Sequence, residues 1–327
     1  MEIYELSLDG GVKRIERLPR AVRLVCAFGC FDGVHVGHQA LLSTAVRVSE
    51  GLGGEKEKLA PAIWTFSEPV SKPWLFSVDE RLSLSGRCGI KYALCQRFED
   101  VRTLSPEEFI GGLVERCGLM HGVCGENFRF GYKGAGDPAR LEQSIRDSLS
   151  RLGAFVDDKT KTVSVVGDVL ALGGIVSSTR IRALLAEGEV ESVERLLGRP
   201  YSLSGTVRAG KQIGRTMSRP TVNLSFAHGQ LIPKRGVYFA YCRVGEKIYR
   251  GVTNVGYRPT VNSDAESVTC ETHLLDFSES IYGEQIEIIF VHYRRAEMIF
   301  DSTDALSRQI TDDVTAATEF FDKKENG

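Results

Sequence analysis

The feature of this sequence that most constrains its fold is a change of hydrophobic pattern at Gly198-Arg199-Pro200. Before this point, short apolar runs alternate with helical repeats, which predicts a doubly wound, Rossmann-like parallel sheet. Beyond it, segments rich in β-branched and aromatic residues alternate with glycine-containing turns, as in a small antiparallel barrel. Because 327 residues exceed the usual size of one core, we expect an α/β domain over 1–198 and a β domain over 199–327, with one large domain as the alternative.

The elements of the first domain follow from local signals. Apolar runs predict parallel strands at 22–29, 62–66, 91–95 and 120–125, with a helix over about 38–49. A capping box with proline at the first helical position, Ser105-Pro106-Glu107-Glu108, predicts a helix over 106–117. A longer helical repeat over 181–198 ends at the glycine and proline of the expected boundary.

The second domain has two clear strand signals, 237–244 and 285–293. An amphipathic helix over about 303–322 closes the chain, and we expect its apolar face to pack on the barrel. That face carries Leu306, Ile310, Val314, Ala317 and Phe321.

Composition limits the partners. With 41 basic and 43 acidic residues, the net charge of -2 gives no overall field for nucleic acid or an acidic membrane, so an anionic ligand must be held locally. No stretch approaches the roughly 20 apolar residues that span a bilayer, and segment 1–20 lacks a signal peptide's apolar core, so we expect a cytoplasmic protein. Its eight cysteines then fit reduced thiols, and Cys26 and Cys30 lack the spacing of a zinc site.

The first chemical signal is G-C-F-D-G-V-H-V-G-H, residues 29–38, at a predicted strand-to-helix junction. Glycines let backbone N–H groups approach a phosphate, and the following helix adds a positive dipole. His35 and His38, three residues apart, can both donate to the charge that builds on a nucleotide α-phosphate under attack. The alternative is that His35 caps the turn and His38 packs against the sheet.

This segment closely resembles the G-x-F-D-G-x-H-x-G-H signature of bacterial bifunctional riboflavin kinase/FAD synthetases, a branch of the H-x-G-H nucleotidyltransferases. The resemblance implies an adenylyltransferase ATP site that includes Gly29, Phe31, Asp32, Gly33, His35 and His38. Residues 125–131, G-E-N-F-R-F-G, resemble a second family segment at the carboxyl end of a predicted strand. That likeness implies that Asn127 contacts the flavin.

Residues 177–182, S-S-T-R-I-R, resemble a third family segment and open a helix. An ordinary Ser/Thr N-cap is part of the explanation. Hydroxyls and an arginine at a helix start also suit the pyrophosphate leaving group, because Arg180 can bind two phosphate oxygens. The resemblance therefore implies Ser178, Thr179 and Arg180 as ATP-phosphate ligands, with Arg182 either structural or functional.

The implied reaction is attack of the flavin mononucleotide (FMN) phosphate on the α-phosphorus of ATP, giving FAD and pyrophosphate. The nucleophile is already ionised, so positioning and charge neutralisation by His35, His38 and Arg180, with Mg²⁺, carry the catalysis. The chain departs from the family at T-F-D-P-H-P, where residues 65–70 read T-F-S-E-P-V and Val70 has no neighbouring histidine. The missing histidine is an ATP-contacting group in the family, so adenylylation is slow or another residue makes the ATP contact.

The second chemical signal lies after the boundary. Residues 204–215 alternate glycine with basic residues, which suits a flap over polyphosphate. Thr221 and Asn223 share one strand face and offer hard oxygens to magnesium, although a proline turn before a strand is the simpler account in isolation. The segment resembles the kinase family's G-F-P-T-A-N motif, with Ser218-Arg219 replacing Gly-Phe. The implied ATP and magnesium contacts are Gly210, Lys211, Gly214, Thr221 and Asn223.

Further segments continue in family order. Residues 251–260 resemble a flavin-side segment, which implies flavin contacts by Asn254, Gly256, Arg258 and Thr260. Phosphorylation of a primary alcohol needs a carboxylate to accept the hydroxyl proton, and Glu271 fits that role in the family's E-x-H segment. A solvated surface glutamate is the alternative. Arg295 contacts flavin or nucleotide, or pairs with Glu297 or another acid.

The motifs together indicate an enzyme that converts riboflavin to FMN and FMN to FAD, using ATP and Mg²⁺ at two separate sites, with small-molecule substrates and no nucleic-acid or membrane partner. One alternative is a riboflavin kinase whose N-terminal domain has lost adenylylation, as the missing histidine near Val70 suggests. A flavin-sensing or nucleic-acid-binding module is a third reading, and the balanced charge opposes its nucleic-acid version.

Overall fold

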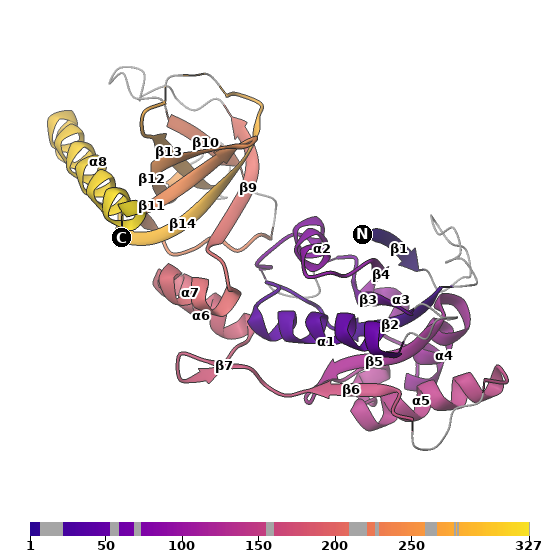
Figure 1. Cartoon of the computed structure of the whole chain (residues 1–327). Coiled ribbons are helices and arrows are strands. Elements are labelled where there is room, and N and C mark those ends of the chain that lie inside the picture. Colours follow the sequence, from indigo (N-terminus) through magenta and orange to yellow (C-terminus); the bar gives the residue numbers. More distant parts are fainter. Residues whose placement is uncertain are drawn as a thin grey trace. The chain divides into compact units, whose positions relative to one another are not determined.

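The computed structural model describes the chain in segments: 1–6, 22–52, 59–68, 73–154, 160–208, 221–225, 229–258, 267–277, 279 and 281–326. The chain forms two compact units, Met1–Ser178 and Thr179–Gly327 (Figure 1). In these segments no helix has the length and apolar character needed to cross a bilayer. The eight cysteines all lie in the described part, and no disulfide joins any of them there.

Six parallel strands form the sheet of the first unit, in the order β1-β4-β3-β2-β5-β6. They are β1 (Glu2–Leu6), β2 (Arg23–Phe28), β3 (Leu59–Phe66), β4 (Tyr92–Gln96), β5 (Leu119–Gly125) and β6 (Val163–Val166). The four strands predicted from apolar runs are β2 to β5, so the doubly wound sheet is confirmed. No apolar run in the sequence indicated β1 or β6.

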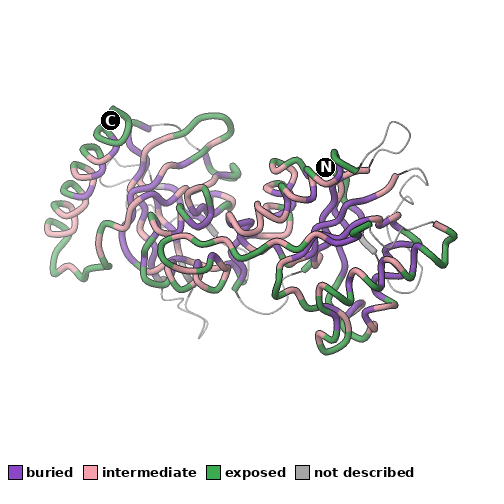
Figure 2. The backbone as a smooth tube through the Cα atoms, turned by 60° about the horizontal axis from the view of Figure 1, so that its bottom comes forward, coloured by how far each residue is buried: buried purple, intermediate pink, exposed green. Residues whose placement is uncertain are grey.

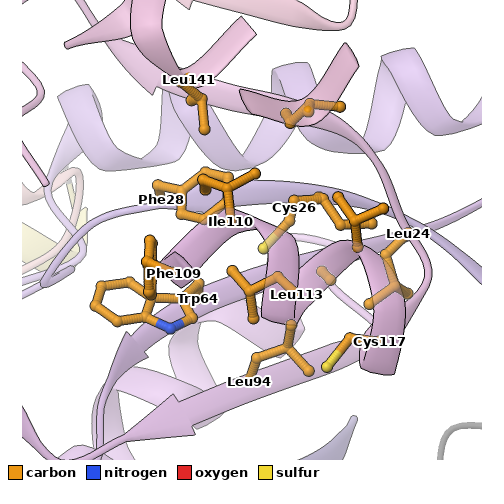
Figure 3. Close-up of a cluster of buried hydrophobic side chains, with 14 of the residues drawn as sticks. Leu24, Cys26, Phe28, Trp64, Leu94, Phe109, Ile110, Leu113, Cys117 and Leu141 are labelled. Atoms are coloured by element: carbon orange, nitrogen blue, oxygen red, sulfur yellow. The ribbon is translucent and has the colours of Figure 1, made fainter. Parts of the chain in front are cut away.

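Helices cover both faces of this sheet. They are α1 (Val36–Leu52), α2 (Val78–Arg87), α3 (Phe98–Val101), α4 (Pro106–Cys117) and α5 (Pro138–Arg151), with a 3-10 turn at Tyr132–Gly134 and a hairpin of β7 (Leu170–Ala171) and β8 (Gly174–Ile175). Figure 3 shows the core under α4 and α5, where Phe28, Trp64, Phe109 and Leu141 meet. The predicted capping box is present, since Ser105 and Glu108 satisfy each other's backbone N–H groups.

The single helix predicted over 181–198 was wrong in one respect, because the segment forms two helices, α6 (Ser178–Glu187) and α7 (Val190–Leu197). Gly188 between them takes a left-handed φ of 81°, which a glycine adopts at little cost. The backbone N–H of Lys234 then binds the carbonyl of Leu185 at 2.8 Å. Apolar spacing continues across the break, so periodicity alone could not locate it.

The second unit is a closed antiparallel barrel in the order β10-β13-β12-β11-β14-β9. Its strands are β9 (Tyr201–Arg208), β10 (Thr221–Ser225), β11 (Gly236–Val244), β12 (Lys247–Arg258), β13 (Ser267–Leu274) and β14 (Gln285–Arg295). Helix α8 (Thr303–Asn326) buries Ala317 and Phe321 against Phe239 and Val291, while much of its remaining surface is exposed (Figure 2). The predicted barrel and closing helix are confirmed.

The contacts divide the chain at Ser178, before the boundary expected at Gly198. The reason is that α6 and α7 pack with the barrel, as shown by the 2.6 Å contact between His292 Nδ1 and Glu191 Oε1. A functional boundary between 198 and 199 stays a prediction.

Candidate functional site

The loop after β2 is held in an unusual backbone conformation. Phe31, Gly33 and Val34 all have positive φ, at 50°, 94° and 41°, and the Val34 N–H binds the Phe31 carbonyl at 3.1 Å. Such strain in two non-glycine residues persists only where surroundings fix it, and it clusters at functional sites. Here the Phe31 and Val34 side chains are fully buried and anchor the turn. We call residues 29–35 the phosphate loop.

Asp32 ties the phosphate loop to two other segments. Its carboxylate accepts the backbone N–H groups of Leu75 at 3.0 Å and Phe76 at 3.3 Å, just before α2. Its carbonyl accepts the Ser178 hydroxyl at 2.7 Å, so the structure brings together two predicted site residues that are distant in sequence. Thr179 and Arg180 follow Ser178 in the first turn of α6.

The two histidines lie against each other, with ring centroids 3.6 Å apart and planes 15° from parallel. His35 Nδ1 accepts the backbone N–H of His38 at 3.2 Å, which places the proton of a neutral His35 on Nε2. Burial first, and then the neighbouring His35 and Arg81, hold the pKa of His38 well below its usual range. The imidazole of His38 can therefore act as a neutral hydrogen-bond donor at neutral pH, and the Nε2–H of His35 is free of the bond that its Nδ1 accepts.

An aromatic cavity of about 370 Å³ lies beside the phosphate loop. Its lining consists of Gly29, Cys30, Trp64, Phe66, Phe98, Val101, Arg102, Phe109, Phe128, Arg129, Phe130, Gly131, Lys133 and Gly134. The Phe128 and Phe130 rings stack with centroids 5.4 Å apart, and Asn127 is exposed next to Phe128. Flat aromatic walls suit a flat conjugated ligand. Sequence reasoning missed this lining because its residues come from several elements, with only F-R-F beside Asn127 as a signal.

In the barrel, the strand register places three predicted residues in one row. Asn223 of β10 lies opposite Glu271 of β13, and Glu271 lies opposite Asn254 of β12. Directly opposed residues project from the same face of a sheet, so these three side chains share one face. We call them the polar row. Asn223 is buried and Glu271 is half-buried.

The neighbouring row faces the other way and supports the polar row from inside. Thr253 and Thr272 are fully buried, and their hydroxyl oxygens lie 2.9 Å apart. A further acid, Glu297, reaches the polar row by accepting the Asn254 side-chain N–H at 3.3 Å. A Cβ at Gly256 would lie 2.2 Å from Glu297 Oε1, so glycine makes room for this carboxylate. Sequence reasoning treated Glu297 only as a partner for Arg295.

Arg295 has an acidic partner, which is Asp313 of α8. Its Nε lies 3.1 Å from both carboxylate oxygens, and Nη2 lies 2.6 Å from Oδ2, in a forked pair. Of the alternatives left open by the sequence, pairing with another acid is what the structure shows. A flavin contact by Arg295 stays a prediction.

Breaking this pair should loosen the second unit alone. Because Asp313 is buried, Asp313→Asn leaves the Arg295 charge poorly compensated, and we expect a loss of about 2 to 4 kcal/mol in the free energy of unfolding of the barrel. Urea unfolding followed by circular dichroism measures this loss, while the fluorescence of Trp64 and Trp74, both in the first unit, stays unchanged. Glu279→Gln, which removes an exposed pair with Lys247, is the control and should change little. An unchanged barrel transition in Asp313→Asn would contradict the role given to the pair.

Comparisons with known proteins match both halves of the chain. A family model described as FAD synthetase matches residues 19–166, and one described as riboflavin kinase matches residues 197–321. The bifunctional riboflavin kinase/FMN adenylyltransferase of Escherichia coli K12 is 33% identical over 333 residues, covering 97% of this chain and 98% of that protein. This chain belongs to the bifunctional riboflavin kinase/FMN adenylyltransferase family.

Another member of the bifunctional family, from Listeria monocytogenes, is 30% identical over 310 residues and covers 93% of this chain and 95% of its own length. A crystal structure described as a macrolide-efflux protein from Streptococcus pneumoniae superposes with a TM-score of 0.82 at 24% identity, covering 97% of this chain and 99% of that one. At that identity the likeness shows the shared fold alone.

Not every residue expected from the bifunctional family can be placed. Thr221 lies opposite His273, and Arg258 ends β12, but only their backbones are described. Gly210, Lys211, Gly214 and Thr260 lie outside the described residues, as do Ser218-Arg219 and Val70. Their roles stay predictions.

Proposed function

We propose that this chain phosphorylates riboflavin with ATP at the polar row and adenylylates the resulting FMN with a second ATP at the phosphate loop. The observation that carries the proposal is the presence, in separate units, of a stacked imidazole pair where a strained loop meets α1 and of a carboxylate flanked by two amides. The family models that match the two halves support it. Residues 1–198 would form the adenylyltransferase domain and 199–327 the kinase domain.

At the phosphate loop, the FMN phosphate attacks the α-phosphorus of ATP and pyrophosphate leaves. His35 Nε2–H and the imidazole of His38 donate hydrogen bonds to the oxygens that gain charge. Neither histidine has to transfer a proton, because the attacking FMN phosphate is already ionised. Gly29, Gly33 and the loop N–H groups hold the phosphates, while Ser178, Thr179 and Arg180 bind the pyrophosphate end.

The aromatic cavity is the place we assign to the flavin ring. It adjoins Gly29 and Cys30, so a flavin stacked there would present its phosphate to the phosphate loop. Asn127 directly precedes Phe128 of the lining, and its exposed amide would bind the polar edge of the ring. The aromatic wall and the loop are both intact, which favours two activities over a kinase with a degenerate first domain.

At the polar row, Glu271 accepts the proton of the riboflavin 5′-hydroxyl as the γ-phosphoryl group arrives. Asn254, Gly256, Arg258, Thr260 and Arg295 would lie on the flavin side. Asn223 sits directly beside this carboxylate in the register, and its amide oxygen with the Thr221 hydroxyl would hold Mg²⁺. These hard oxygen donors fit that ion, which usually takes few protein ligands and completes its shell with phosphates and water. When bound, it neutralises phosphate charge and aligns the γ-phosphoryl group.

The test is product analysis of the purified protein. Riboflavin with ATP and Mg²⁺ should give FMN and then FAD, FMN with ATP should give FAD and pyrophosphate, and chelation of Mg²⁺ by EDTA should stop both reactions. Chromatography with flavin fluorescence detects each product. Riboflavin consumption with no FAD at any magnesium concentration would reduce the function to the kinase alone, and absence of both products would refute the proposal.

A further inference from the structure

A buried arginine stands directly behind the phosphate loop. Arg81 of α2 is 5% exposed, and its Nη1 donates to the carbonyl of Cys30 while Nη2 donates to that of Phe66 at 3.5 Å. These carbonyls lie just past the end of β2 and at the end of β3. In an open α/β sheet, ligands bind outside the carboxyl ends of the strands, so Arg81 touches the backbone on which the nucleotide would rest.

The start of α2 is locked to the phosphate loop from both sides. A capping box between Ser77 and Glu80 fixes the first turn, which sets the position of Arg81. Asp32 reaches from the loop to the N–H groups before that turn, and Arg81 reaches back to Cys30. The Cys30 carbonyl also accepts the Thr65 hydroxyl at 3.1 Å. The loop conformation therefore depends on Arg81 as well as on its own sequence.

The charge of Arg81 is incompletely balanced. Among the described residues it forms no salt bridge with a carboxylate, and its buried Nε makes no hydrogen bond there. Burial lowers the pKa of Arg81, and the more distant Asp32 charge only partly opposes this. A buried cation without an ion pair costs free energy, and the approach of an anion would relieve that cost. The polyphosphate of ATP is such an anion.

We propose that Arg81 is a positioning residue for the adenylyltransferase reaction. Its guanidinium fixes the Cys30 and Phe66 carbonyls so that the phosphate loop presents its N–H groups to the ATP phosphates, and it places positive charge behind them. Phe66 also lies in the segment 65–70, in which the family histidine is missing. This inference rests on the proposed adenylyltransferase function.

The test compares Arg81→Met and Arg81→Lys with Arg87→Met, an exposed position on the same helix. FAD formation is measured with ATP and FMN varied separately, and the binding of inorganic pyrophosphate is measured by calorimetry without turnover. In Arg81→Met the KM for ATP and the Kd for pyrophosphate should rise about tenfold, the effect of losing one charge-assisted interaction. The KM for FMN should rise less than the KM for ATP, because Cys30 and Phe66 also line the cavity assigned to the flavin. Arg81→Lys keeps the charge and should lose about threefold, while Arg87→Met and the kinase reaction should match the wild type.

Unchanged ATP and pyrophosphate constants in Arg81→Met would overturn the inference. Equal increases in both KM values, with a lower tryptophan-fluorescence melting temperature, would also overturn it, because they indicate a packing role. Should Arg81→Met fail to fold, Arg81→Gln gives the same comparison. A wild-type protein that makes no FAD refutes the proposed function instead, and pyrophosphate binding still reports on Arg81 in that case.

Discussion

Replacing His38 by alanine is expected to lower kcat/KM for FAD formation from FMN about 10²- to 10³-fold, the usual effect of removing a donor to a developing oxyanion. The substitution removes an imidazole that stacks on His35 and stays neutral, because its pKa is held well below the usual range. The loop should keep its shape, since the bond from position 38 to His35 Nδ1 uses the backbone N–H.

The kinase reaction of the same protein is the control for this variant. Riboflavin phosphorylation takes place in the other unit and should proceed at the wild-type rate in His38→Ala. Fluorescence of Trp64 and Trp74 reports whether the first unit is still folded. Wild-type FAD formation in a folded His38→Ala protein would support the alternative that this histidine only packs against the sheet.

Replacing Glu271 by glutamine is expected to slow the other reaction, riboflavin phosphorylation. Riboflavin phosphorylation should fall about 10²- to 10⁴-fold, because the amide cannot accept the hydroxyl proton. The side chain keeps its size, so the barrel and the neighbouring Asn223 and Asn254 should be undisturbed. FAD formation from supplied FMN should be unchanged.

A second strand glutamate tests the surface-residue alternative for Glu271. Glu287 of β14 lies outside the polar row and pairs with Arg243 on the barrel surface. Glu287→Gln should leave both reactions at wild-type rates. Retained riboflavin turnover in Glu271→Gln would show that Glu271 is solvated surface, as many strand glutamates are.

Most of the fold could be predicted from the sequence because its signals are local. The buried runs of β2 to β5, the capping box at Ser105 and the alternation of strand and turn after Pro200 each depend on neighbouring residues. The break at Gly188 was missed because its apolar positions keep helical spacing on both sides. The edge strand β1 also gave no signal, since a short edge strand buries few residues.

The site residues also divide into those that local spacing predicts and those that it does not. His35 ends the phosphate loop and His38 lies in the first turn of α1, so their spacing in the sequence was enough to bring them together. Arg81, the aromatic wall of the cavity and the Arg295–Asp313 pair come together only through tertiary packing, which spacing does not encode. The row that joins Asn223 to Glu271 depends on the strand register of the closed barrel.

Mixing the two active-site variants tests the claim of two separate sites most directly. Equal amounts of His38→Ala and Glu271→Gln are incubated together with riboflavin, ATP and Mg²⁺, and the flavins are separated by chromatography. Alone, the first variant should stop at FMN and the second should leave riboflavin unchanged, whereas the mixture should make FAD because free FMN passes from one protein to the other. A mixture that makes no FAD, or a single variant that loses both steps, would contradict the account.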